Sequence, residues 1–401
     1  MCERYGGIDA QSSYGANEGR MAMERERGLA IGMMSGTSGD GIDAALVQFS
    51  EEGEQFPVMK LVSSHYVPYT ESQRKKLFRL FDPNVSARFV ARMDIELGDW
   101  LGEAALQLMR QADVGPAEIA VIGSHGQTVY HAPNLGVSLQ IGDGARIARA
   151  TGCAVVTDFR RQDIALGGQG APLIPYFDYA YLRDDAMCRV ALNIGGIANV
   201  TILPAAGDFH RVAAFDTGPG NMLIDGLVRE LTGGEQWFDE DGQLAKRGNP
   251  VRHLVEAWLR ADPYVSMPPP KSTGRERYGR DYLARLMTDM RGLSVVDQVA
   301  TVTQFVAESI SVNIAKCVTE PFELIAGGGG RRNGTLMEWI RVSCQPVRLI
   351  DSTDLGIPSD MKEAMAFALF AWQFLHDRPT NVPSATGATQ STQLGKLTPP
   401  M

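Results

Sequence analysis

Three runs near the start of the chain are apolar or alternating and rich in β-branched residues: 28–33, 42–49 and 58–66. Such runs predict three consecutive strands, paired antiparallel. The turn between the first two, Ser35–Gly41, consists of glycines, hydroxyls and one acid. A hairpin tip of this kind exposes backbone N–H groups that can cradle an anion, although an ordinary hairpin turn has the same composition.

The pattern then changes to helical spacing and later returns to its opening form. Residues 70–82 and 86–112 have apolar positions at helical intervals, and short apolar strands follow at 120–123 and 154–156. Residues 190–203 again read as strand, glycine turn, strand. A hairpin that recurs about one domain length later suggests two related domains that arose by duplication.

The remaining chain alternates between loops and regular elements. Polar and basic proline-led compositions predict loops at 235–250 and 267–281. The other predicted elements are a strand at 212–215, a helix at 222–231, an amphipathic helix at 295–317, strands at 323–326 and 347–350, and a helix at 359–377.

These elements predict an α/β protein of two related domains, with mixed sheets flanked by helices. We expect the first domain at 28–187, joined by the helix 359–377, and the second at 188–357. Residues 1–27 lack periodicity and are expected to form a disordered extension. Residues 378–401 are rich in Pro, Ser and Thr and are expected to form a surface tail.

Composition narrows the class of protein. The 401 residues are 44% hydrophobic and 21% charged, as in soluble proteins with sizeable cores. A net charge of −9 argues against nucleic-acid or anionic-membrane partners, because both require an excess of cations. The five cysteines form no CxxC pair, and no signal-peptide core or membrane-length apolar run occurs. A cytoplasmic protein fits these features.

Common nucleotide and hydrolase motifs are missing from the sequence: it has no GxxxxGK[ST], no GxGxxG fingerprint, no GxSxG and no HExxH. Instead, glycine-rich turns follow strands at Ser35–Gly41, at Gly195–Gly196 with Asp216–Gly220, and at Gly327–Gly330. Each alone is consistent with a tight turn. Together they indicate a nucleotide held between two domains.

A set of short motifs extends this pattern and carries a resemblance. The motifs are Ser35–Asp43, Gly123–Thr128, Asp158–Arg161, Gly167–Leu173, Leu192–Gly196, Phe215–Asn221, Pro270–Glu276 and Glu363–Ala368. In this order they resemble the signature set of the anhydro-N-acetylmuramic acid kinase family, within the actin/hexokinase/chaperone ATPase superfamily. The resemblance covers nearly everything from residue 29 to about residue 395.

The resemblance implies a two-domain kinase with a nucleotide and sugar cleft between its domains. Its cofactors would be ATP and Mg²⁺. Its reaction would open the 1,6-anhydro ring of 1,6-anhydro-N-acetylmuramic acid with water and phosphorylate O6, giving N-acetylmuramate 6-phosphate in peptidoglycan recycling. The family also implies a homodimer. A rival from another class is a chaperone-like or filament-forming ATPase that uses hydrolysis only as a switch.

Two carboxylates are the candidate catalytic residues. Asp216 follows a strand, where it could be the general base for water or the N-cap of the next helix. The residue matches the family's catalytic aspartate, which favours the base. Glu363 opens the last predicted helix, where the helix dipole also favours an acid. Its place in the family motif suggests that it faces the sugar or the attacking water.

The cofactor-binding candidates are backbone and hydroxyl groups of the glycine-rich turns. They are Gly36, Thr37, Ser38, Gly39, Asp40, Gly41, Ile42, Asp43, Gly195, Gly196, Gly327, Gly328 and Gly329. Asp40 is the candidate contact for Mg²⁺, reached through water. For Asp43, a contact to Mg²⁺ and a plain strand-start residue are equally consistent with the sequence. Gly39 departs from the family pattern, which usually has a bulky apolar residue there.

The motif context also points to residues that could bind the substrate: His125, Arg160 and Gln169. Cations at Arg160, Arg161 and 271–275 could meet the lactyl carboxylate or the phosphates, although solvated surface cations are commoner. A lone histidine such as His125 is more often a hydrogen-bonded structural residue than an acid–base group.

Overall fold

A computed structural model describes residues 27–36, 39–52 and 55–401. The expected extension at 1–27 lies, except for Arg27, outside these described residues. Packing divides the chain into two compact units. Unit 1 comprises the chain to Gln162 with 363–379 and 392–401; unit 2 comprises 163–362 and 380–391. Each unit is described by itself.

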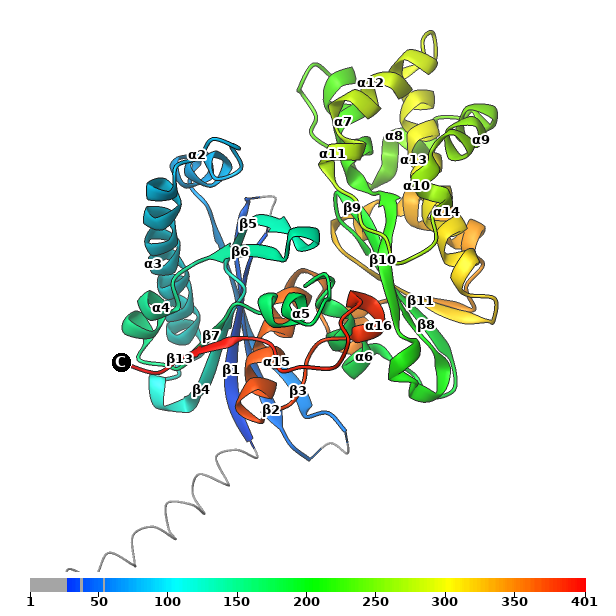
Figure 1. Cartoon of the computed structure of the whole chain (residues 1–401). Helices are drawn as coiled ribbons and strands as arrows, with labels where there is room; N and C mark the ends of the chain where they lie inside the picture. Colours follow the sequence, from blue (N-terminus) through cyan, green and yellow to red (C-terminus); the bar gives the residue numbers. More distant parts are fainter. Residues whose placement is uncertain (1–26, 37–38, 53–54) are drawn as a thin grey trace, which may run out of the picture. The chain divides into compact units, whose positions relative to one another are not determined.

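Unit 1 is built on a six-stranded mixed sheet in the order β13-β7-β4-β1-β2-β3 (Figure 1). The strands are β1 (Arg27–Ser35), β2 (Gly41–Ser50), β3 (Val58–Pro68), β4 (Ile119–Ser124), β7 (Val155–Thr157) and β13 (Lys396–Thr398). The pairs β1–β2 and β2–β3 are antiparallel, as predicted, whereas β4 runs parallel to β1 and to β7. A small hairpin of β5 (Gln127–Ala132) and β6 (Val137–Ile141) follows β4.

Helices cover both faces of this sheet (Figure 1). They are α2 (Glu71–Arg79), α3 (Ala87–Ala112), α4 (Gly144–Thr151) and α15 (Lys362–Leu375). Ile31 and Met33 of β1 pack in one core with the apolar stripe of α3. Gly32, between them, faces the opposite side, because successive strand residues alternate. There the backbone of α15 approaches β1 so closely that a Cβ on Gly32 would lie 1.8 Å from the Ala364 carbonyl oxygen.

Unit 2 has a five-stranded sheet in the order β10-β9-β8-β11-β12. The strands are β8 (Cys188–Ile194), β9 (Ile197–Leu203), β10 (Ala213–Pro219), β11 (Phe322–Gly327) and β12 (Arg348–Asp351). The first three are antiparallel neighbours, and β11 pairs parallel with both β8 and β12.

The helices of unit 2 are mostly short and pack around one long helix, α13 (Val295–Cys317). The others are α5 (Arg161–Ala165, at the boundary of the units), α6 (Ile174–Leu182), α7 (Asn221–Leu231), α8 (Gln243–Arg247), α9 (Arg252–Ala261), α10 (Pro263–Ser266), α11 (Arg275–Tyr278), α12 (Arg280–Asp289), α14 (Gly334–Cys344) and α16 (Pro383–Thr386). The stripe predicted on α13 is buried throughout: Val299, Val302, Val306, Ile310 and Ile314.

The two sheets share one plan, which confirms the prediction of two related domains. In each, three consecutive antiparallel strands are followed by two parallel ones, so β3-β2-β1-β4-β7 corresponds to β10-β9-β8-β11-β12. The predicted boundary at 187/188 differs from the packing division after Gln162, which assigns α6 and the loop before it to unit 2. In the described residues, no helix has the length and apolar character needed to cross a bilayer.

Three predictions for irregular segments need correction. The predicted loop at 235–250 contains α8, and that at 267–281 contains α11 and the start of α12. The predicted surface tail is partly core: Val382 and Leu394 are buried, and β13 pairs with β7. The sequence could not predict the short helices, because a helix of a single turn leaves no periodic signal. The polar tail can be buried because its side chains find hydrogen-bond partners: the Asn381 amide donates to the Asp163 carboxylate.

The contact between β1 and α15 generates a stability prediction. Gly32→Ala is expected to destabilise the protein by about 3 kcal/mol or more, because the new Cβ would meet rigid helix backbone rather than a movable side chain. Gly115→Ala is the matched control, since a Cβ there meets only the Glu118 carboxylate at 3.7 Å. Denaturant unfolding of both variants would measure the difference, and equal stabilities would contradict the packing argument.

Candidate active site

Asp216 lies in the middle of β10, where the pairing with β9 becomes irregular, and is held by α10 and the segment that follows it. Its backbone N–H donates to the Lys271 carbonyl (3.2 Å), and its own carbonyl accepts from the Tyr264 hydroxyl (2.9 Å). Its carboxylate oxygen Oδ2 accepts the backbone N–H of Thr273 (2.9 Å). This one segment therefore fixes both the main chain and the side chain of Asp216.

The surroundings of Asp216 tune its acidity toward neutral pH. Burial raises the pKa of its carboxyl group to about 6, and the nearby charge of Glu276 acts in the same direction. The Thr273 N–H and the Lys271 ammonium oppose that rise. A base with a pKa just below the working pH is ionised and still basic enough to take a proton, as general base catalysis requires.

The alternative role for Asp216, as the N-cap of the following helix, is wrong. The residue in the N-cap position of α7 is Gly220, and no side chain caps this helix. The first amides of α7 instead reach neighbouring carbonyls: the N–H of Asn221 donates to Gly195, and that of Met222 to Gly196. The Asp216 carboxylate therefore has no structural duty at α7.

The three glycine-containing turns of unit 2 lie together at one end of the sheet. The Gly220 N–H donates to the Gly196 carbonyl (2.9 Å), which joins the turn after β10 to the turn after β8. Gly328, after β11, packs on the same β8 turn, since a Cβ there would lie 2.6 Å from the Ile194 carbonyl oxygen. Sequence segments more than 100 residues apart thus form one backbone surface.

Two kinds of glycine can be distinguished in this surface. Gly220 and Gly328 are required by the protein itself, because a Cβ would meet backbone within 2.4 and 2.6 Å. At Gly195, Gly196 and Gly329 a Cβ would find no atom closer than 3.4 Å. Protein packing does not require the last three to be glycine.

The corresponding turn of unit 1 lies between β1 and β2. Thr37 and Ser38 are outside the described residues. Gly39 adopts a positive φ of 66°, and its N–H donates to the Gly36 carbonyl (3.1 Å). The ring of Phe78 on α2 lies 3.4 Å from where a Cβ of Gly39 would be. Phe78 therefore occupies the space beside this turn, next to where the family usually has a larger apolar residue.

The acids of this turn differ in their surroundings. Asp40 is exposed and forms an ion pair with Arg74 on α2 (3.7 Å). Asp43 is part-buried within β2, opposite Met34 and Tyr66; Gly41 and Ile42 are buried at the start of the same strand. Within the described part of the chain, no group of three or more His, Cys, Asp or Glu residues could hold a metal ion. A single carboxylate such as Asp40 could contact, through water, an Mg²⁺ ion that is held mainly by nucleotide phosphates.

His125 and Arg160, both predicted to bind substrate, are brought together in unit 1. The Arg160 guanidinium donates through Nε (3.1 Å) and Nη2 (2.9 Å) to the His125 Nε2. Since Nε2 accepts, the ring proton is on Nδ1, which donates to the Gly126 carbonyl (3.0 Å). Burial and the Arg160 charge lower the pKa of His125 to about 3, so its ring is neutral. His125 positions Arg160 and does not transfer protons near pH 7.

Arg160 stays cationic despite its crowded position. Burial lowers the pKa of its guanidinium to about 10, and the nearby carboxylate of Glu363 opposes the fall. Phe367, one turn further along α15, packs against the His125 ring in a tilted arrangement with centroids 4.8 Å apart. Glu363, Arg160 and His125 therefore form one group on unit 1, with Glu363 exposed at its edge.

The other predicted residues are not in this group. Gln169 is exposed in unit 2, where its backbone N–H donates to Thr386 (2.8 Å). Asp216 also belongs to unit 2, whereas Glu363 belongs to unit 1. The predicted site residues therefore form separate groups on the two units.

Sequence reasoning missed the residues that support these groups. In unit 1 the Ser35 hydroxyl contacts both the Tyr69 hydroxyl and the Gln127 side-chain oxygen, each at 2.8 Å. In unit 2 Lys271 is buried and bonded to Asn313, instead of reaching outward to a carboxylate or phosphate as a loop cation would. A usable signal was present: Asn313 is a polar residue beside Ile314 on the apolar stripe of α13.

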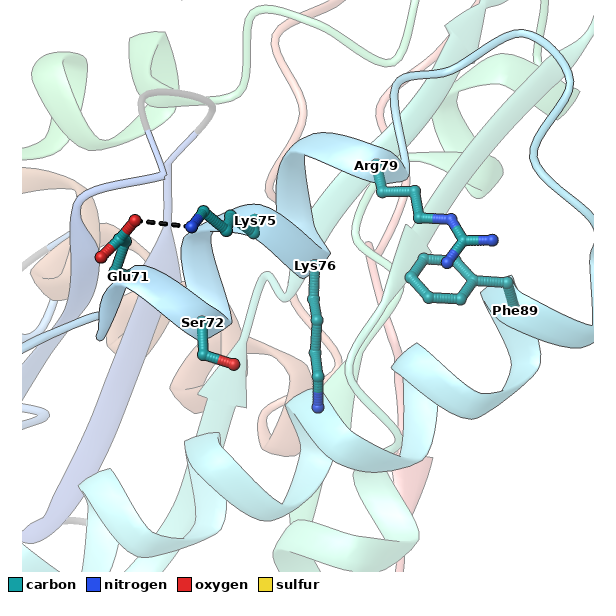
Figure 2. A pocket seen from close by; sticks show the side chains of 6 residues that line it. All are labelled: Glu71, Ser72, Lys75, Lys76, Arg79 and Phe89. Carbon is teal, nitrogen blue, oxygen red and sulfur yellow. Dashed lines mark ion pairs between the residues drawn. The ribbon is translucent and has the colours of Figure 1, made fainter.

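A cavity of about 470 Å³ lies elsewhere on unit 1, between α2 and α3 (Figure 2). Its cations are already engaged: Lys75 pairs with Glu71 (2.6 Å), Lys76 with Glu96 (2.5 Å), and Arg79 lies over the Phe89 ring. None of the predicted site residues lines it. This pocket is a surface groove between charged side chains.

The two units share one α/β strand order, and each carries glycine-rich turns at strand ends. The chain is therefore a duplicated α/β protein. The chain belongs to the anhydro-N-acetylmuramic acid kinase family: the family described as "Anhydro-N-acetylmuramic acid kinase" matches residues 28–400. Proteins of that name are similar to it in Caldanaerobacter subterraneus (43% identical, covering 93% of this chain and 97% of the relative) and Gloeobacter violaceus (43%, covering 92% and 98%). One from Bacillus cereus is 38% identical, covering 92% and 98%.

The raised pKa of Asp216 predicts how the stability of the folded protein depends on pH. Its folded pKa is raised, so the folded state favours the neutral acid, and stability falls as pH rises from about 4 to about 6. Asp216→Asn keeps an oxygen for the Thr273 N–H without the charge. At pH 8 this variant is expected to be more stable than wild type by about 1–3 kcal/mol. The gain should vanish near pH 4, and denaturant unfolding at both pH values would test it.

Proposed function

We propose that this chain is an ATP-dependent kinase that opens the 1,6-anhydro ring of 1,6-anhydro-N-acetylmuramic acid with water and phosphorylates O6. Family membership supports the kinase and its sugar. The observation that carries the mechanism is the part-buried Asp216 carboxylate, which accepts the Thr273 N–H and has a pKa raised to about 6.

The reaction balances with one base. The water oxygen forms a bond to the anomeric carbon while the bond from that carbon to O6 breaks. O6 forms a bond to the γ-phosphorus, the bond from phosphorus to ADP breaks, and Asp216 takes the water's proton. Because the phosphoryl group captures O6, the leaving oxygen needs no general acid, and positioning with charge neutralisation provides the remaining catalysis.

Backbone amides are the proposed phosphate and nucleotide contacts. In unit 1 these are the turn that contains Gly36, Gly39 and Asp40, together with Thr37 and Ser38. In unit 2 they are Gly195, Gly196 and the turn Gly327–Gly329. The backbone at Gly195, Gly196 and Gly329 has no protein atom closer than 3.4 Å to a Cβ position, which suits close approach of a nucleotide. Mg²⁺ bound to the phosphates would neutralise their charge, with Asp40 as its candidate contact through water.

Arg160 is the proposed contact for the lactyl carboxylate of the sugar. It is cationic, it is oriented by a neutral histidine, and guanidinium groups bind carboxylates through paired hydrogen bonds. Glu363 and Gln169 remain candidates for sugar hydroxyls. We further propose a cytoplasmic enzyme of peptidoglycan recycling that acts as a homodimer, as the family implies.

The direct test is ADP release with and without the anhydro sugar. We expect turnover to require both ATP and 1,6-anhydro-N-acetylmuramic acid, with N-acetylmuramate 6-phosphate as the product by mass spectrometry. Sugar-independent ATP hydrolysis at the full rate would reject the kinase and favour a switch ATPase.

Asp216→Asn tests the base. Its kcat is expected to fall about 10²–10⁴-fold, the usual contribution of a general base, while ATP still binds by calorimetry. In the wild type, kcat/KM should fall as pH drops through about 6, because protonated Asp216 cannot accept the proton. A variant with near-normal turnover would exclude Asp216 as the base.

A glycine pair tests the nucleotide surface. Gly329→Ala is expected to leave the melting temperature unchanged, because a Cβ there meets nothing closer than 3.9 Å, but to weaken ADP binding at least about tenfold. Gly328→Ala is the contrast, since its φ of 78° and a backbone oxygen 2.6 Å from the Cβ predict lost stability. Unchanged ADP affinity in Gly329→Ala would remove this turn from the nucleotide site.

A further inference from the structure

Lys271 is a buried cation that makes no direct ion pair in the described residues. Its side chain is 8% exposed, and its Nζ donates to the Tyr264 carbonyl (2.8 Å) and to Asn313 Oδ1 (2.6 Å). The ammonium also lies over the Tyr264 ring, 4.6 Å from the centroid. Burying an ammonium is costly unless it is well bonded, so its place beside the candidate base needs an explanation.

The contacts of Lys271 converge on Asp216 and Thr217 in β10. Its carbonyl accepts the Asp216 N–H, and Tyr264, to which its ammonium donates, holds the Asp216 carbonyl through its hydroxyl. Asn313, its other partner, donates to the carbonyl of the next residue, Thr217 (2.9 Å). Lys271 thus connects its own loop, α10 and α13 to these two residues of β10.

Asp216 is one of the charges that stabilise the Lys271 ammonium, and the other charged groups nearby must be compared with it. From α13, Lys316 repels the ammonium and the Cys317 thiol favours it; Asp262, before α10, also favours it. Asp262 is itself committed to the hydroxyls of Tyr278 (2.9 Å) and Tyr282 (3.0 Å). It is also committed to the guanidinium of Arg277 (3.6 Å), which also lies over the Tyr264 ring. On the Asp216 side the facing groups are Glu276, which disfavours its charge, and Lys271, which favours it.

We propose that Lys271 is a positioning residue of the kinase reaction, whose buried ammonium both fixes β10 at Asp216 and Thr217 and keeps the Asp216 carboxylate ionised. This proposal rests on the proposed function. It adds that the active form of the enzyme is a charge pair without direct contact, in which Asp216 is negative and Lys271 positive.

The charge pair predicts a bell-shaped pH profile. Burial and the Lys316 charge lower the pKa of Lys271 to about 8, while the pKa of Asp216 is about 6. Below about pH 6 the base is protonated, and above about pH 8 the ammonium is lost. The profile of kcat/KM is therefore expected to have limbs near these two values.

Lys271→Met removes the charge and retains much of the side-chain length. We expect its alkaline limb to disappear and its acid limb to move up by about one pH unit, since Asp216 loses a favourable charge. If both limbs stay where they are in the wild type, Lys271 has no electrostatic role and the proposal is overturned.

If Lys271→Met does not fold, Lys316→Gln tests whether the Lys271 charge sets the alkaline limb. This substitution does not change the buried residues. Lys316 is exposed and contacts the Val265 carbonyl through Nζ (2.7 Å). Removing its repulsion should raise the alkaline limb by about half a pH unit, whereas Lys316→Arg, which keeps the charge, should not. An alkaline limb that is equal in Lys316→Gln and wild type would overturn the proposal. A wild type without sugar-dependent turnover would instead reject the proposed function before any variant is compared.

Discussion

The hydrogen bonds between Asp216 of β10 and the segment from Tyr264 to Thr273 are the constraint on which the rest of the candidate site depends. They satisfy the N–H and C=O of Asp216 from outside the sheet and add a third bond to its carboxylate. The same enclosure removes water from the carboxylate and raises its pKa, because an ionised group loses solvation on burial. The segment from Tyr264 to Thr273 therefore sets both the position of the Asp216 carboxylate and its basicity.

Close backbone approach is the second recurring feature. In unit 1, Gly32 and Gly123 let α15 lie directly on β1 and β4, which brings Glu363 and Phe367 to the strand ends that carry His125. In unit 2, glycines let three turns merge into one backbone surface. In both units, small residues set the site geometry because they allow main chain to pack against main chain.

Much of this arrangement could be predicted from local pattern. The β1–β2 turn, the hairpin of β8 and β9, and the buried stripe of α13 follow from alternation and helical spacing, which depend on neighbours in sequence. The recurrence of the hairpin predicted the duplication that the two sheets display. The one-turn helices and the buried tail could not be predicted in this way, since α11 and Asn381 are held by partners distant in sequence.

By itself the sequence determined the main strands and the long helices, the family motifs and the identity of the acids and glycines, because these depend on residue type and spacing. Only the tertiary structure excluded Asp216 as a helix cap, by assigning the N-cap position of α7 to Gly220. It also decided that His125 is a neutral partner of Arg160 and that Lys271 points inward to Asn313. Protonation and orientation depend on burial and on partners from distant segments, and these exist only in the folded chain.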